Sequence, residues 1–293
     1  MADAAALRMT AWAPVSALRP HQWVKNLIVL LPVATAHAWD RLPAALLAAA
    51  ACCAAASAIY LVNDWCDRTA DAVHPRKRHR AIASGALGGG GVALLALLLA
   101  AIASGLALTA GATTAIWLAG YALLAILYSA WLKRVLGLDV VLLTGFYLVR
   151  LGIGAAAVEH VLSPWLAVFA AGAFGSLACL KRVGELAARG GEARRAWRPA
   201  HLPALTLAGA LASAVAVVTL AAYPLSATAN LLYPHPWFLA LPALPLAWWL
   251  LRVWRLGRAG RLHHDPVAFA LRDPGAWAVV GVAAGAVLLG AWR

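Results

Sequence analysis

The sequence predicts an all-α protein that crosses a membrane several times, and three observations support this class. Of the 293 residues, 64% are hydrophobic and 12% are charged, whereas soluble domains carry about 25% charged residues. The mean hydropathy is +0.80, so a water-soluble core could not enclose this much apolar surface. The apolar runs have the length of membrane-spanning helices, about 20 residues, and are too long for barrel strands.

Nine apolar runs are expected to span the membrane as helices. They lie at about 24–40, 43–66, 91–109, 112–132, 138–158, 164–186, 202–222, 237–256 and 275–292. We expect them to form a single membrane-embedded domain over residues 1–293.

Several helix boundaries carry recognisable signals. A polar residue followed by proline is typical of a helix N-cap and first turn. This pair occurs at the sixth span, at the last span and in the loop before the last span, as Ser163-Pro164, Asp273-Pro274 and Asp265-Pro266. Pro75 and the run from Gly88 to Gly91 indicate an irregular loop after the second span.

The positions of the basic residues predict the orientation. All of the 24 Lys and Arg residues except Arg41, Arg150 and Arg293 lie before the first span or around every second loop. The positive-inside rule then places the N-terminus in the cytoplasm of a bacterium, with the chain in its inner membrane. The active site is expected on the cytoplasmic face, in loops at about 67–90, 133–137, 187–201 and 257–274. The net charge of +13 therefore reflects topology and anionic ligands, not nucleic acid.

The clearest chemical signal is an acidic stripe at the end of the second span. Asp64, Asp67 and Asp71 are spaced i, i+3 and i+7, so on a continuous helix they would share one face, beside Asn63. Clustered carboxylates at a membrane edge need a counter-ion. Oxygen ligands without His or Cys suit Mg²⁺, with Mn²⁺ as an alternative. A solvated helix end paired with basic neighbours such as Arg68 is the other interpretation.

A basic segment follows the acidic stripe and contains Arg76, Lys77 and Arg78. Cations beside a carboxylate-bound metal are the arrangement that holds a diphosphate, because metal and guanidinium groups neutralise it from two sides. The same residues would also fix the orientation of the chain, and both interpretations stay open.

Further polar groups lie at span ends or inside a span. They are Gln22, Lys25 and Asn26 before and in the first span, Tyr128 and Lys133 at the end of the fourth, Arg150 within the fifth, and Lys181, Arg182 and Glu185 at the end of the sixth. Arg150 is far from both ends of its span, so it must face a polar cavity or a partner. An interfacial anchor is the alternative for the first group, and a helix-surface ion pair is the alternative for Lys181 and Glu185.

The stripe Asn63-Asp64-x-x-Asp67-x-x-x-Asp71 resembles the first Asp-rich motif of the UbiA superfamily of intramembrane prenyltransferases. Over about residues 15–290 the chain more narrowly resembles the decaprenyl-phosphate phosphoribosyltransferase branch. The matching segments are Arg19-Pro20-x-Gln22-Trp23-x-Lys25-Asn26, His74-Pro75-x-Lys77-Arg78, Tyr128-Ser129-x-x-Leu132-Lys133, Lys181-Arg182-x-x-Glu185-Leu186 and Asp265-Pro266-Val267-x-Phe269. One departure is Ala81, where we would expect Pro.

The resemblance implies nine helices around a central cavity and transfer of 5-phosphoribose from phosphoribosyl diphosphate (PRPP) to a polyprenyl phosphate, with release of diphosphate. The catalytic residues would be Asp64, Asp67 and Asp71, which bind Mg²⁺ together with Asn63. The substrate-binding residues would be Gln22, Lys25, Asn26, Asn63, Arg76, Lys77, Arg78, Tyr128, Lys133, Arg150, Lys181, Arg182 and Glu185. Synthesis of an arabinose donor for the cell envelope, contact with membrane lipid and a homotrimer are further implications.

Other functions stay open. In the same fold, a prenyl diphosphate could alkylate an aromatic acceptor. However, the region after the sixth span offers Lys181, Arg182, Glu185 and Glu192 in place of a second D-x-x-x-D motif, which favours a substrate with an extra phosphate. A lipid or metabolite transporter predicts inverted repeats and broken helices, with polar residues in both leaflets, whereas the ionisable residues here crowd one face. A structural subunit would leave the acidic stripe unexplained.

Overall fold

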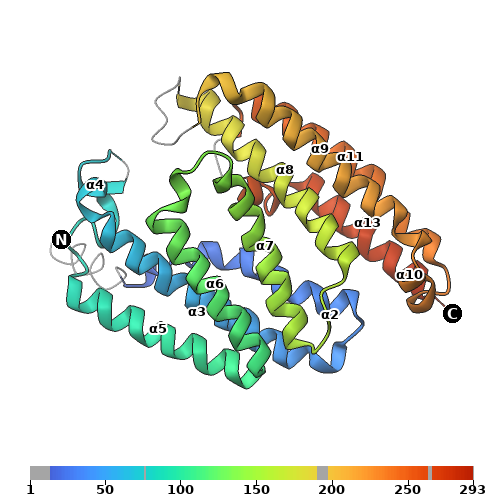
Figure 1. Cartoon of the computed structure of the whole chain (residues 1–293), viewed down its shortest axis with the longest axis horizontal. Helices are drawn as coiled ribbons and strands as arrows, with labels where there is room; N and C mark the ends of the chain where they lie inside the picture. The colour runs from blue at the N-terminus through green and yellow to red at the C-terminus, as the bar shows by residue number, and fades with distance from the viewer. Residues whose placement is uncertain (1–13, 76, 190–196, 263–265, 293) are drawn as a thin grey trace, which may run out of the picture. The chain divides into compact units, whose positions relative to one another are not determined.

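The computed structural model describes residues 14–75, 77–189, 197–262 and 266–292. Within these ranges all regular secondary structure is helical (Figure 1), so the predicted all-α class is confirmed. The chain divides into two compact units. Unit 1 comprises Met1–Trp131 and Val149–Leu162, and unit 2 comprises Leu132–Leu148 and Ser163–Arg293. Helix α7 (Leu138–Ala157) contributes residues to both units. The organisation as a single membrane-embedded domain stays a prediction.

The remaining elements follow in chain order. Unit 1 contains the 3₁₀ segments η1 (Pro20–Leu30), η2 (Trp39–Arg41) and η3 (Lys77–His79), and the helices α2 (Leu31–Thr35), α3 (Leu42–Cys66), α4 (Arg68–Ala72), α5 (Gly89–Ala110) and α6 (Ala112–Ala130). Unit 2 contains η4 (Leu132–Arg134), α8 (Pro164–Arg189), η5 (Pro199–His201), α9 (Leu202–Ala222), η6 (Tyr223–Leu225), α10 (Ala227–Leu232), η7 (Pro236–Ala240), α11 (Ala243–Arg258), α12 (Pro266–Ala270) and α13 (Pro274–Ala291).

Eight helical segments among the described residues are long and apolar enough to cross a membrane. They correspond to the second to ninth predicted runs, as expected of a multi-pass membrane protein. The first predicted run, 24–40, is instead the 3₁₀ segment η1 followed by the five-residue helix α2. Pro32 at the start of α2 has no backbone N–H to donate, which is consistent with a change of helix type at this point. A 3₁₀ helix of 11 residues is long for its kind.

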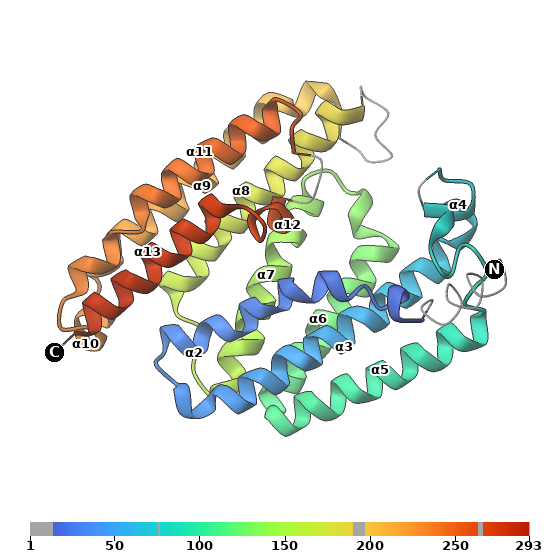
Figure 2. The same ribbon diagram turned by 180° about the vertical axis from the view of Figure 1, so that it is seen from behind.

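Helix α3 is the central element of unit 1. Figures 1 and 2 show α5 running alongside it, and η1 packs against it as well. Its buried positions are mostly small, including Ala48, Ala51 and Cys52, which lets neighbouring helices approach closely. Gly154 of α7 serves the same purpose, because a Cβ atom there would lie 2.0 Å from the carbonyl oxygen of Val29.

Helix α5 begins earlier than the glycine run suggested. Its first residue is Gly89, which the prediction had placed in an irregular loop. A Cβ atom on Gly89 would lie 2.6 Å from the indole ring of Trp65. The glycine thus marks a close approach of a helix start to a neighbouring aromatic ring, not a break in the chain.

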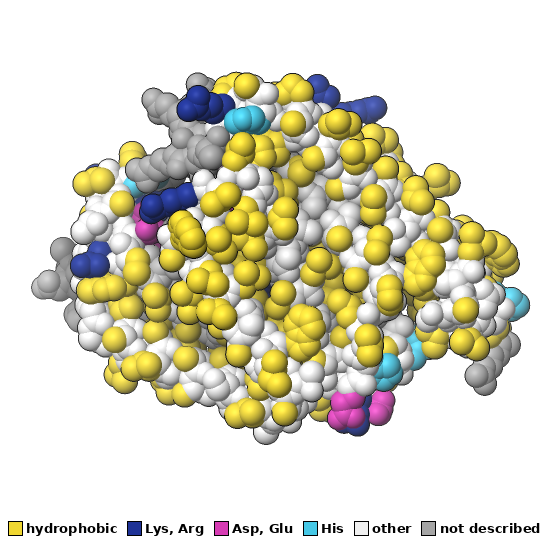
Figure 3. Space-filling model, in the orientation of Figure 1, with side chains coloured by type: hydrophobic (Ala, Val, Ile, Leu, Met, Phe, Trp, Pro, Cys, Tyr) yellow, Lys and Arg dark blue, Asp and Glu magenta, His cyan; other side chains and the backbone are white. Residues whose placement is uncertain are grey.

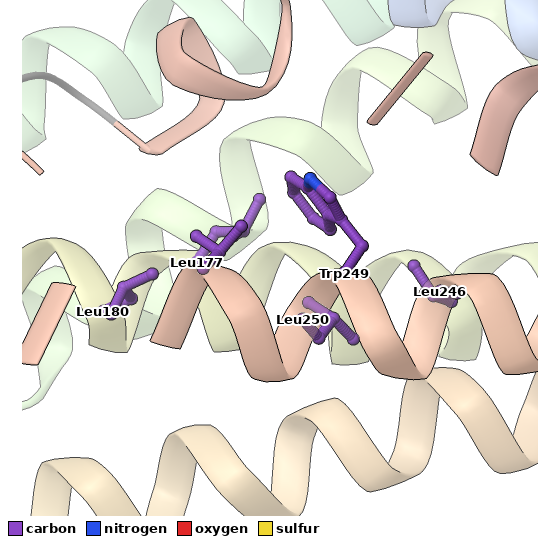
Figure 4. Packing of buried hydrophobic residues seen from close by; sticks show 6 residues of the cluster. Leu177, Leu180, Leu246, Trp249 and Leu250 are labelled. Carbon is purple, nitrogen blue, oxygen red and sulfur yellow. The ribbon is translucent and has the colours of Figure 1, made fainter. Parts of the chain in front are cut away.

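In unit 2 the core lies between α8 and α11. Leu177 and Leu180 of α8 pack with Leu246, Trp249 and Leu250 of α11 (Figure 4). Gly172 of α8 lets α9 approach, since its Cβ would lie 2.7 Å from a backbone nitrogen of α9.

The outer faces of both units are apolar. Hydrophobic side chains cover most of the face shown in Figure 3, and charged side chains lie mainly at its margins. Leu94 and Leu97 of α5 are each 71% exposed. Such faces are stable in hydrocarbon, which is the environment that the spans predict.

Candidate active site

The acidic stripe is not a continuous helix face. Helix α3 ends at Cys66, Asp67 takes a non-helical conformation with φ −89° and ψ 0°, and α4 begins at Arg68. Asp64 and Asp71 are buried, whereas Asp67 is exposed. Asp64 and Asp71 both contact Arg80, and Asp67 does not join them, so the three carboxylates do not form the single cluster that the spacing suggested.

Three cations hold the two buried carboxylates, and we call these five residues the acidic cluster. Arg80 Nη1 lies 3.1 Å from Asp64 Oδ1 and 2.6 Å from Asp71 Oδ2. Lys77 Nζ lies 3.3 Å from Asp71 Oδ1. Arg19 Nη2 donates to both oxygens of Asp64, at 2.6 and 2.8 Å. Sequence reasoning included Lys77 among the site residues but assigned no role to Arg19 or Arg80.

Arg19 is held in place by its surroundings. Its guanidinium group lies over the ring of Tyr60, 5.0 Å from the centroid, which adds a cation–π contact. Its backbone is left-handed, with φ 54°, and the preceding carbonyl, that of Leu18, accepts a hydrogen bond from Ser57 Oγ at 2.9 Å. Arg80 instead lies in the turn that follows η3.

Below the acidic cluster, polar contacts continue between η1 and α3, and we call them the polar ladder. Trp23 Nε1 donates to Ser57 Oγ at 2.9 Å, and Asn26 Nδ2 donates to Cys53 Sγ at 3.3 Å. Ser57 and Cys53 lie about two and three helical turns before Asp64, so the polar ladder reaches a depth of about 16 Å from Asp64 along α3. It carries polar groups from the helix end into the apolar part of unit 1.

Arg150 forms the inner end of the polar ladder. It is 7% exposed, and its Nε donates to Asn26 Oδ1 at 2.8 Å. Its Nη2 donates to the hydroxyl of Tyr121 at 2.9 Å. The prediction that an intramembrane arginine faces polar partners is supported by these contacts. Tyr121 and Cys53 were not anticipated.

The acidic cluster has the donor chemistry of a divalent-cation site. The described residues contain no group of three His, Cys, Asp or Glu side chains positioned to hold a metal ion. However, one oxygen of Asp64 and one of Asp71 converge on a single nitrogen atom of Arg80, within 3.1 Å. Two buried carboxylates that share one cation offer hard oxygen ligands, which Mg²⁺ prefers. Asn63 and Asp67 lie on the adjoining turn and would complete such a set.

The remaining predicted residues of unit 1 lie on several different elements. Gln22 and Lys25 are half-buried on η1, and Tyr128 is half-buried near the end of α6. Arg78 is exposed and donates from Nε to His79 Nε2 at 3.3 Å. Arg76 lies outside the described residues, and the side chain of Lys133, in unit 2, is not described either.

Unit 2 contains a separate buried cluster around Arg182. Its Nε lies 2.7 Å from Asp139 Oδ2, and its Nη1 donates to Glu185 Oε2 at 2.6 Å. Asp139 also accepts hydrogen bonds from Trp197 Nε1 at 3.0 and 3.1 Å. The side chains of Asp139 and Arg182 are each 1% exposed. Arg182 Nη2 has no hydrogen-bond acceptor among the described residues. Lys181, its neighbour, is half-buried.

A further aspartate caps the last helix. Asp273 accepts a hydrogen bond from the backbone of Ala276 at 3.0 Å, which confirms the predicted N-cap. It also accepts from Arg252 Nη1 at 2.7 Å and Trp249 Nε1 at 2.9 Å. Burial alone would raise the pKa of Asp273, but these donors outweigh it and hold the pKa below its ordinary value.

The sequence of the chain is similar to that of one known protein family and of several named bacterial proteins. The model of the UbiA prenyltransferase family matches residues 27–278. An uncharacterized protein of Sinorhizobium fredii is 35% identical, over 94% of this chain and 55% of that protein. The nodulation protein NoeC of Azorhizobium caulinodans is 36% identical, over 58% of this chain and 56% of that protein. The decaprenyl-phosphate phosphoribosyltransferase of Mycobacterium tuberculosis is 33% identical, over 88% of this chain and 87% of that protein.

The fold also matches a solved structure. A UbiA homolog from Archaeoglobus fulgidus bound to GPP and Mg²⁺ superimposes with a TM-score of 0.69 and 14% identity, over 94% of this chain and 99% of that chain. At this identity the similarity establishes the fold alone. The chain spans only about half the length of the first two relatives that it matches.

Proposed function

Because this chain belongs to the UbiA prenyltransferase family, we propose that it transfers 5-phosphoribose from PRPP to a polyprenyl phosphate and releases diphosphate. The observation that carries the proposal is the acidic cluster, in which two buried carboxylates meet three cations at a helix end. The choice of donor is supported by the similarity to the Mycobacterium tuberculosis phosphoribosyltransferase over most of both chains.

In this proposal a phosphate oxygen of the lipid attacks C1 of the ribose, and the bond from C1 to the diphosphate oxygen breaks. The attacking oxygen is already anionic, so the reaction needs no strong general base. Asn63, Asp64, Asp67 and Asp71 would hold Mg²⁺ or Mn²⁺. A bound divalent ion would neutralise charge on the leaving diphosphate.

The basic residues of the motifs have proposed roles in binding phosphate. In unit 1 these are Arg76, Lys77 and Arg78, with Gln22, Lys25, Asn26, Tyr128 and Arg150 as further substrate-binding residues. In unit 2 they are Lys133, Lys181 and Arg182, with Glu185. Arg182 already pairs with Asp139 and Glu185, so its role in phosphate binding requires a test separate from its role in folding.

The setting of the reaction is part of the proposal. We place the chain in a bacterial inner membrane with a cytoplasmic N-terminus and active site, on the basis of the alternation of Lys and Arg along the sequence. Synthesis of an arabinose donor for the cell envelope and assembly into a homotrimer follow from the branch that the sequence resembles.

A second candidate is prenyl transfer from a prenyl diphosphate to an aromatic acceptor. It is favoured by the family description and by the fold shared with a homolog bound to GPP. The Sinorhizobium and Azorhizobium relatives do not carry the name of a phosphoribosyltransferase, so the donor must be tested directly.

The decisive experiment follows labelled PRPP into lipid. The purified chain is incubated in detergent with a polyprenyl phosphate and Mg²⁺, with and without EDTA. We expect metal-dependent labelling of the lipid. If a folded sample labels no lipid from PRPP but does alkylate an aromatic acceptor with prenyl diphosphate, the second candidate replaces the first.

Asp67→Asn is the most informative variant for this assay. Among the described residues the side chain of Asp67 forms no ion pair or hydrogen bond, and it is exposed, so its replacement should leave the fold intact. Loss of one ligand or charge at the reacting site is expected to reduce the rate about 10²-fold or more. Asp40→Asn is the matched control, because Asp40 is an exposed aspartate in the same unit, 80% accessible and remote in sequence from the acidic cluster. Asp64→Asn should also abolish labelling, but it leaves Arg19 and Arg80 without a shared carboxylate.

A further inference from the structure

Two arginines contact Asp64, and they do so in different ways. Of the two buried carboxylates, Arg19 contacts only that of Asp64, where one of its nitrogens donates to both oxygens. Arg80 uses one nitrogen to join Asp64 to Asp71. Arg80 therefore occupies the point that both buried carboxylates share, which is where an ion bound by both would lie.

The charge balance of the acidic cluster argues against simple addition of a divalent ion. Asp64 and Asp71 already face Arg19, Lys77 and Arg80, so the cations outnumber the buried carboxylates. A divalent ion at the shared position would meet the Arg80 guanidinium at close range, where like charges repel strongly. The ligand distance of Mg²⁺ is about 2.0–2.1 Å, so the ion and the Arg80 nitrogen cannot both lie between the same two oxygens.

The surroundings indicate which cation can leave. Arg19 is braced by Tyr60 and by the contact of Leu18 with Ser57. The side chain of Arg80 is 33% exposed, compared with 23% for Arg19. It lies between η3 and α5, in a turn whose Ile82 is packed into the apolar core. Its departure breaks two ion pairs with carboxylates whose side chains are only 10% and 3% exposed, so Arg80 can leave only when another cation takes its place.

We propose that Arg80 is an internal counter-ion of Asp64 and Asp71, which a divalent cation displaces, while Arg19 stays on Asp64. This inference rests on the metal site of the proposed function. Displacement of Arg80 would raise the net positive charge of the acidic cluster, because the divalent ion carries more charge than the guanidinium that it replaces. The cluster would then attract a diphosphate more strongly once the cation has bound, which couples the two binding events.

Direct measurement of Mn²⁺ binding tests the exchange without any substrate. The full chain in detergent is titrated with Mn²⁺ and the free ion is followed by electron paramagnetic resonance. Arg80→Gln removes the competitor and is expected to lower the Kd for Mn²⁺ about tenfold. Arg68→Gln is the matched control. It removes the same charge from the adjoining helix α4, but Arg68 contacts Trp65 and not the buried aspartates, so its effect should stay within about threefold.

A structural role for Arg80 in the metal site predicts the opposite change in the Kd for Mn²⁺. If Arg80 merely held the aspartates in a shape that binds metal, Arg80→Gln would weaken Mn²⁺ binding or leave it unchanged, and either result overturns the exchange. Absence of Mn²⁺ binding by the unmodified chain would overturn both the exchange and the proposed metal site. Mn²⁺ binding without lipid labelling from PRPP would count against the proposed donor alone.

The unmodified chain provides a second readout in case the Arg80 variant does not fold. Hydrogen exchange of residues 77–87 is compared with and without Mg²⁺. Displacement of Arg80 frees this turn from Asp64 and Asp71, so its amides should exchange faster when the cation is present. Slower exchange on addition of Mg²⁺ would mean that Arg80 remains in the cluster, and the proposal would be wrong.

Discussion

Aspartate–arginine pairs occur in both units, but their surroundings differ. In unit 1, Asp64 pairs with Arg19 and Arg80, whose side chains are 23% and 33% exposed. In unit 2, Asp139 pairs with Arg182, and both side chains are 1% exposed. Partly exposed pairs can exchange partners at low cost, whereas removal of one member of a buried pair leaves an isolated charge in a low-dielectric environment. If the proposed exchange is correct, the same residue types serve ligand exchange in one unit and folding in the other.

Replacement of Arg182 should have the largest effect on stability. Arg182→Met leaves the Asp139 carboxylate buried without a cation, and the expected loss is about 3–5 kcal/mol of unfolding free energy. Thermal unfolding in detergent, followed by tryptophan fluorescence, measures it. The double variant Arg182→Met with Asp139→Leu should regain most of the loss, because neither charge remains.

The contrast between the units would fail if Arg182→Met melted at the normal temperature but no longer labelled lipid. That result would assign Arg182 to phosphate binding rather than to folding.

Replacement of Arg19 should have an intermediate effect. Arg19→Gln removes a charged donor from Asp64, but water and Arg80 can compensate because the pair is partly exposed. We expect a loss of about 1–2 kcal/mol in the metal-free protein. The same melting assay measures it, with Arg68→Gln as the exposed control. If Arg19→Gln lost as much unfolding free energy as Arg182→Met, the ion pairs of the acidic cluster would be as important for folding as those of the buried cluster of unit 2, and the contrast between the units would fail.

Asp273 should show the smallest effect, and it depends on pH. Because its pKa is lowered in the folded chain, ionised Asp273 stabilises the fold above its unfolded pKa, and this contribution is lost as the pH falls through the folded pKa. Asp273→Asn keeps a side chain that can cap α13 and removes only the charge, so we expect a loss of about 0.5–1 kcal/mol at neutral pH.

Melting curves of the Asp273 variant at several pH values test this sign. The variant and the unmodified chain should differ in unfolding free energy by a constant amount above about pH 5. This difference should shrink once the pH falls below 3.8, the ordinary pKa of an aspartate. A difference that grows on acidification contradicts the assignment.

The spans could be predicted because hydrocarbon imposes a simple rule on length and composition. Pro164, Pro266 and Pro274 begin helices as their position after a polar residue suggested. The first span could not be resolved in this way, since hydropathy does not distinguish a 3₁₀ segment from an α-helix. The glycine run at the start of α5 was misleading because glycine marks close approach as well as chain breaks, and only the position of Trp65 separates the two.

Sequence reasoning named Asp64, Asp71 and Lys77 of the acidic cluster but assigned no site role to Arg19 or Arg80. Local spacing identified Asp64 and Asp71, but Arg19 contacts Asp64 across 45 positions and Arg150 contacts Asn26 across 124. No local pattern encodes such pairs. One missed residue did carry a signal. Asp139 lies near the start of an apolar span, and the reasoning that identified Arg150, that an ionisable residue in a span needs a partner, applies equally to it.

The left-handed backbone of Arg19 has a consequence for engineering. A residue with a Cβ atom loses roughly 1–2 kcal/mol in this conformation, and glycine does not. Arg19→Gly would therefore relax the main chain, but it would also remove the guanidinium that holds Asp64, and the two effects on stability are of similar size. Position 19 is thus a point at which a strained backbone is kept for the sake of the ion pair that its side chain makes.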